Sequence, residues 1–159
     1  MKTKIFSSMV LFLFTLSSVA QDLQVQGNAS GYTNSGGVLT IQSAGSYTVS
    51  MSSGIDTTYT NRILISATGS DTVSVTLSDV HINLSSIAST PAFDITGTAP
   101  VKLLLAGTNS LASGSDCAGL QKSGSGSLLL LGGGSLTATG GKYGAGIGGG
   151  NQGARHGTA

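Results

Sequence analysis

The feature that most constrains the fold of this chain is an internal repeat with a period of about 26 residues, within the range of known solenoid repeats. The phrase "LAGTNSL" at positions 105–111 returns as "LLGGGSL" at positions 130–136. Alanines recur in a matching phase at positions 92, 118 and 145. Such a period is typical of solenoids, in which each repeat stacks on the previous one.

Each period holds up to three short apolar stretches, separated by small and polar residues. The stretches are residues 63–65, 73–77 and 80–84 in one copy, 93–95, 101–105 and 111 in the next, and 118–120, 128–131 and 136–139 in the third. Apolar and polar residues alternate in "TVSVTL" at 72–77, which is a strand pattern, and no helical period is sustained. The sequence therefore predicts an all-β fold, a right-handed single-stranded parallel β-helix.

The N-terminal segment, positions 1–20, has the pattern of a secretory signal peptide. A basic start at Lys2 and Lys4 precedes an apolar run, and small residues at Ser18 and Ala20 form a cleavage site. The alternative, a membrane anchor, fits less well because the run is shorter than the ~20 residues that span a bilayer. We expect cleavage after Ala20, a secreted or cell-surface location, and no membrane span in the mature chain.

The remaining chain divides into three parts by pattern. Residues 21–60 precede the regular repeat and predict an N-terminal cap or a first irregular coil, and residues 61–150 predict the coils. The tail at residues 151–159 has no capping pattern, so we expect the solenoid to be truncated at its C-terminus.

The charge of the mature chain argues against two classes of partner. Removing Lys2 and Lys4 from the seven Lys and Arg leaves five cations against six Asp and no Glu, a net charge of −1. Nucleic acids and anionic membranes need a basic patch, so neither is an expected partner. A lone cysteine, Cys117, allows no internal disulfide and is interpreted as a small packed or turn residue.

The glycine-rich phrase at positions 140–150 holds seven glycines in eleven residues. Its position in the repeat matches that of "GSDCAGLQKSGSG" one coil earlier, which predicts a tight corner between strands. Two alternatives for this phrase fit less well. A flexible linker would not need to keep the phase of the repeat, which this phrase keeps. A phosphate-binding loop would end in Lys followed by Ser or Thr and precede a helix, and neither feature is present.

Several phrases together resemble a known family. "GGVLTIQSAGSYTVSM", "VTLSDVHINLSS", "APVKLLLAGTNSLASG" and "GSLTATGGKYGAGIGGG" are similar to the strand-turn phrases of the secreted bacterial carbohydrate-binding β-helix family. The resemblance covers residues 36–150 and implies a right-handed β-helix, export, and binding to a polysaccharide or cell-surface glycan, with calcium as an accompanying ion. These phrases are scaffold phrases, and they transfer no ligand residue.

Candidate site residues follow from side-chain chemistry. Asp79, Asp94 and Asp116 are candidates for a calcium site on one side of the solenoid, because calcium prefers oxygen ligands. The alternative is that they are solubilising charges, and Asp79 is also interpreted as a turn former. Tyr143, Lys142 and Asn109 are the candidate sugar contacts. Asp79 and His81 lie two residues apart and so share a strand face, which would allow a histidine–carboxylate dyad. No nucleophile or metal partner accompanies them.

The sequence thus favours a non-catalytic, exported polysaccharide-binding module. A structural stalk or adhesin segment of a larger surface protein is the alternative. A polysaccharide lyase or hydrolase ranks third, because only an analogy of fold supports it.

Overall fold

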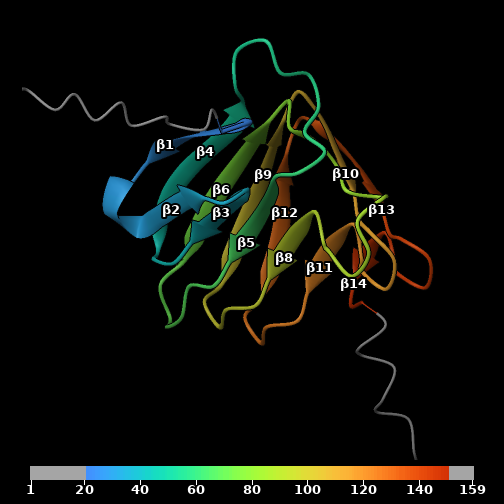
Figure 1. The fold of residues 1–159 in the computed structure, drawn as a ribbon. Helices are drawn as coiled ribbons and strands as arrows, with labels where there is room; N and C mark the ends of the chain where they lie inside the picture. The colour runs from blue at the N-terminus through green and yellow to red at the C-terminus, as the bar shows by residue number, and fades with distance from the viewer. Residues whose placement is uncertain (1–20, 151–159) are drawn as a thin grey trace, which may run out of the picture.

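The structure, a computed structural model, describes residues 21–150. The chain winds as a parallel β-solenoid built of three sheets (Figure 1). The later coils contribute a strand to each sheet, whereas the first coil meets the second sheet only through an isolated bridge from Thr58 to Ile82. The described residues include one short 3-10 turn, Ala29–Gly31, and no α-helix, so none of them forms a helix that could cross a membrane. The predicted all-β parallel solenoid is confirmed. The predicted cleavage site at Ala20 and the tail at 151–159 lie outside the described residues.

Each sheet stacks equivalent strands of successive coils. The first sheet runs in the order β1 (Leu23–Gly27), β4 (Gly45–Met51), β6 (Val73–Ser78), β9 (Val101–Ala106) and β12 (Leu128–Gly132). The second sheet contains β7 (His81–Asn83), β10 (Thr108–Ala112) and β13 (Ser135–Thr139). The third sheet contains β2 (Tyr32–Ser35), β3 (Val38–Ile41), β5 (Arg62–Ile65), β8 (Phe93–Ile95), β11 (Leu120–Lys122) and β14 (Ile147–Gly148).

The register of the coils corrects the repeat inferred from the sequence phrases. Leu105 pairs with Gly132 and not with Leu130, so the later coils are two residues longer than the phrases indicated. A shift of two residues keeps every side chain on the same face of a strand, so apolar alternation alone could not detect it. The earlier coil is longer still, because Ile63 pairs with Phe93 whereas Phe93 pairs with Leu120.

Inward side chains form ladders along the solenoid axis. Val75 and Leu103 are paired in register between β6 and β9, and both are fully buried. Phe93 and Leu120 are paired between β8 and β11 and are also fully buried. These stacked Val, Leu, Ile and Phe side chains hold the three sheets together, because each coil removes apolar surface of its neighbour from water.

The two ends of the described solenoid differ. At the N-terminal end β1 pairs antiparallel with β4, and β2 pairs antiparallel with β3, so an antiparallel strand covers the first coil in the first and third sheets. At the other end β12, β13 and β14 are the last strands of their sheets. Leu130, whose partner Leu103 is fully buried, is 38% exposed there, and Ile147 is 52% exposed.

Candidate functional site

The corner that joins the second sheet to the third carries three unusual residues. Ser89, Asp116 and Tyr143 lie at equal intervals along the chain and have φ values of 53°, 65° and 68°. Residues other than glycine rarely adopt this left-handed region, and they cluster where function fixes the backbone. We call these three residues the corner row.

Backbone hydrogen bonds between successive coils hold the corner row. The N–H of Ser89 donates to the carbonyl of Ser115 at 3.1 Å, and the N–H of Asp116 donates to the carbonyl of Lys142 at 2.8 Å. Adjacent coils therefore place their corner residues about 4.8 Å apart, which is the spacing of paired strands.

A cavity of about 290 Å³ opens beside the corner row. Its lining mixes two carboxylates, a guanidinium, an amide, a thiol and small groups. The lining residues are Arg62, Ser89, Pro91, Asp94, Asp116, Cys117 and Gln121. They come from β5, β8, β11 and the corner, so segments of several coils build one cavity.

Asp94 is the most buried charged side chain of this cavity. It points away from the core, because its strand neighbours Phe93 and Ile95 are fully buried inside. Unlike a solubilising charge, however, it is only 8% exposed, and its Oδ1 atom is buried without a hydrogen-bond partner. An acceptor left unsatisfied in this way favours a ligand that donates a hydrogen bond.

The surroundings of Asp94 shift its pKa in opposing directions. Burial raises the pKa of Asp94, and the positive charge of Arg62 and hydrogen bonds from Gln121, Ile95 and Ser123 lower it. Burial has the larger effect, so the pKa lies above the ordinary value of 3.8. The cavity thus disfavours a bare charge at this position unless a ligand compensates it.

Tyr143 and Lys142 extend the corner by one coil beyond Asp116. The ring of Tyr143 is 69% exposed, and Lys142 Nζ lies 4.9 Å from its centroid. This cation–π contact leaves much of the Tyr143 side chain accessible. Two of the three predicted sugar contacts, Tyr143 and Lys142, are therefore available at the surface.

Cys117 forms part of the cavity wall and is 6% exposed. Burial, followed by the negative charges of Asp94 and Asp116, raises the pKa of its thiol. A thiol with a raised pKa is a poor nucleophile, so Cys117 serves as a small packed residue, as the sequence indicated.

Asn109 does not fit the predicted role in sugar binding. It is fully buried, and its Oδ1 accepts a hydrogen bond from the N–H of Val80 at 3.0 Å. Its Nδ2 donates to the carbonyls of Ala106 and Ser135. Asn109 thus satisfies backbone groups of three coils and has no surface to offer a ligand.

The three predicted calcium ligands do not come together. Asp94 and Asp116 line the corner cavity, whereas Asp79 lines a separate cavity of about 480 Å³ with Asp56 and His81. Within residues 21–150 no group of three or more acidic, histidine or cysteine side chains could hold a metal ion. Two carboxylates beside the Arg62 guanidinium do not fit a dication that takes six to eight oxygen ligands.

Asp79 has the turn role that its position indicated. Its φ is 51°, and its Oδ1 accepts a hydrogen bond from the N–H of Thr108 at 2.9 Å. His81 lies on the outer face of β7, where its Nδ1 is 2.9 Å from the Oγ of Ser110 on the next coil. These contacts connect neighbouring coils.

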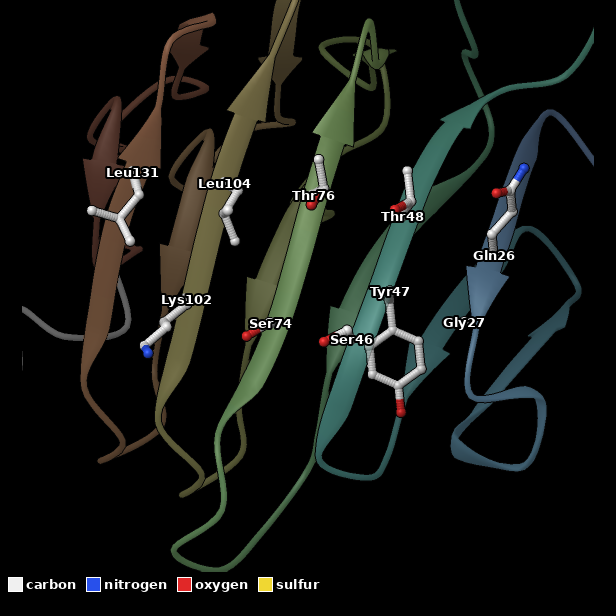
Figure 2. A pocket seen from close by; sticks show the side chains of 10 residues that line it. All are labelled: Gln26, Gly27, Ser46, Tyr47, Thr48, Ser74, Thr76, Lys102, Leu104 and Leu131. Carbon is white, nitrogen blue, oxygen red and sulfur yellow. The ribbon is translucent and has the colours of Figure 1, made fainter.

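A second candidate surface is a shallow groove of about 540 Å³ on the outer face of the first sheet. Figure 2 shows Ser46 and Thr48 of β4 beside Ser74 and Thr76 of β6, with side chains of β9 and β12 further along. The groove contains neither of the two buried unpartnered side-chain atoms found among the described residues, Asn34 Oδ1 and Asp94 Oδ1. The corner cavity is therefore the stronger candidate.

The fold and the corner define the protein as a three-sheet β-solenoid with a polar lateral cavity. Comparison of the chain with protein-family models, with curated proteins and with solved structures finds no match. Function must therefore be inferred from the chemistry of the site itself.

Proposed function

We propose that the protein is an exported, non-catalytic module that holds a polysaccharide against the corner row and its cavity. The observation that carries this proposal is the buried, unpartnered Oδ1 of Asp94 in a cavity also lined by Arg62 and Gln121. Carboxylate, guanidinium and amide groups can each hydrogen-bond sugar hydroxyls, and a hydroxyl would satisfy this oxygen. The exposed ring of Tyr143 offers an apolar face one coil away.

The proposed export rests on positions 1–20, which have the signal-peptide pattern. Mass spectrometry of the secreted protein should find Gln21 as its first residue. An intact N-terminus at Met1 on the released protein would contradict this part of the proposal.

Retention on immobilised and insoluble polysaccharides, together with a glycan array, tests the binding role. We expect the protein to be retained on at least one glycan, and Asp94→Leu and Tyr143→Ala to weaken that retention. The matched control is Thr76→Ala in the groove of the first sheet, which should bind like the parent. Loss of binding in Thr76→Ala alone would move the site to the groove, and no retention on any glycan would refute the proposal.

Calcium is a separate arm of the same experiment. Because Arg62 shares the cavity with Asp94 and Asp116, we expect chelator to leave glycan retention unchanged. Retention that disappears with chelator and returns with calcium would show that the ion is required after all.

A second candidate function draws on the last rung. Leu130 and Ile147 occupy core positions but are 38% and 52% exposed, so further coils could stack there, as in a stalk or adhesin segment. Isolation of the natural protein as a free single-domain product would argue against this candidate.

A further inference from the structure

The two exposed tyrosines among the described residues lie on the same corner of the solenoid. Tyr59 is 59% exposed and Tyr143 is 69% exposed, whereas Tyr47 is buried in the core. Tyr59 follows Thr58, which forms a parallel bridge with Ile82 of β7, and it precedes β5. It therefore belongs to the first coil of the corner where Tyr143 belongs to the fourth.

Buried polar contacts fix the turn that presents Tyr59. Thr58 is 1% exposed, and its Oγ1 accepts hydrogen bonds from the N–H of Asn61 at 3.0 Å and of Thr60 at 3.4 Å. Asn61 is itself only 6% exposed. The backbone on either side of Tyr59 is thus anchored while its ring faces solvent, an arrangement that lowers the entropy cost of binding.

The residues that line the corner cavity come from the coil of Tyr59 and from the two coils that separate it from the coil of Tyr143. Arg62 follows Tyr59 in the first coil, Ser89 lies in the second, and Asp116 lies in the third, one coil before Tyr143. Three coil steps separate the tyrosines, which corresponds to about 14 Å along the axis at the spacing of paired strands.

We infer that the ligand is an extended, neutral glycan lying parallel to the solenoid axis, with Tyr59 as its second aromatic contact. This inference rests on the proposed function. Each pyranose unit of an extended β-linked glycan advances by about the spacing of one coil, so successive units meet successive coils. The charges along the corner, Arg62 and Lys142 against Asp94 and Asp116, balance one another, which favours a neutral chain over an acidic one.

Size ladders of one to six sugar units test the inference by titration calorimetry. The probes are neutral gluco-, xylo- and N-acetylchito-oligosaccharides, with galacturonate oligomers as the acidic comparison. Tyr59→Ala should weaken binding of a neutral hexasaccharide roughly three- to tenfold, the range of one aromatic contact, and leave disaccharide binding unchanged. Tyr143→Ala should weaken hexasaccharide binding to a similar extent.

Two control variants accompany Tyr59→Ala. Tyr59→Phe keeps the ring and should bind the hexasaccharide like the parent protein. Leu129→Ala removes a side chain that is 48% exposed on the outer face of β12 and should have no effect.

Two outcomes would overturn the inference, and a third would overturn the proposed function on which it rests. Unchanged hexasaccharide binding in Tyr59→Ala, with a loss in Tyr143→Ala, would show that the glycan does not run along the axis. Binding of galacturonate oligomers in preference to the neutral ladders would refute the neutral ligand. No binding of any glycan would instead refute the proposed function.

Discussion

Inward-pointing leucines are buried to different extents at the two ends of the described solenoid. Leu23 of β1 is 1% exposed, because this strand lies antiparallel along β4 and its side chain joins the core. Leu130 of β12 points inward like its partner Leu103 but is 38% exposed. The contrast teaches that burial in a solenoid depends on the neighbouring coils and only secondarily on the residue type.

The difference between interior and last rung should be largest for an apolar side chain. Leu103 lies between Val75 and Leu130 and is fully buried, so Leu103→Ala should lower the free energy of unfolding by about 2–5 kcal/mol. Leu130→Ala should cost less than half as much, because part of its side chain is already hydrated. Urea unfolding followed by circular dichroism measures both.

Equal losses in the two variants would break the comparison. They would mean that Leu130 is covered in solution, either by residues of the chain outside 21–150 or by another copy. Sedimentation of the parent protein would then separate these two cases, because only the second changes the mass.

Most of the fold could be predicted from the sequence, because inward Val, Leu and Ile residues recur in short alternating runs. The register could not be predicted. The phrases at 105–111 and 130–136 placed Leu105 opposite Leu130, but backbone pairing places it opposite Gly132. Alternation is blind to shifts of two residues, and the longer coil between Ile63 and Phe93 obscured the regular period of the later coils.

The site was less accessible to sequence reasoning than the fold. Ser89, Asp116 and Tyr143 share a φ region and a place in the coil but no chemistry, so no motif connects them. Their equal spacing is the signal that could have found them, once the coil length was known. The prediction that Asn109 contacts sugar is wrong, because a polar side chain in a turn phrase is expected to be exposed. Its hydrogen bonds to three backbone groups, which bury it, depend on neighbouring coils and are not visible in the sequence.

Asn109 offers a smaller test of how interior coils hold the last rung. Its amide reaches Val80 in the preceding coil and Ser135 of β13 in the last one. Asn109→Ala leaves buried backbone groups without partners and should cost about 1–3 kcal/mol of stability. Hydrogen exchange of the β13 amides should accelerate as well.

Thr108→Ala is the control, because this exposed side chain precedes Asn109 on the same strand. It should change neither stability nor exchange by a comparable amount. Fast β13 exchange already present in the parent would show that the amide of Asn109 does not hold the last rung.

The smallest expected effect concerns Asp94. In the third sheet Asp94 pairs with Gln121, and Gln121 pairs with Gly148 on the last rung, so the last rung has no carboxylate at the equivalent position. Burial raises the pKa of Asp94 above 3.8, so the folded protein binds this proton more tightly than the unfolded chain does. The contribution of Asp94 to stability is therefore greatest below pH 3.8 and is lost as the pH rises through the folded-state value. Asp94→Asn should then unfold at a higher urea concentration than the parent at pH 7, and this advantage should vanish in acid.

A second variant, Gln121→Met, should lower the stability of the protein further at pH 7, because the hydrogen bond from Gln121 lowers the pKa of Asp94. A constant difference between Asp94→Asn and the parent at all pH values would mean that the carboxylate is hydrated, and that this interior position is as open as the last rung.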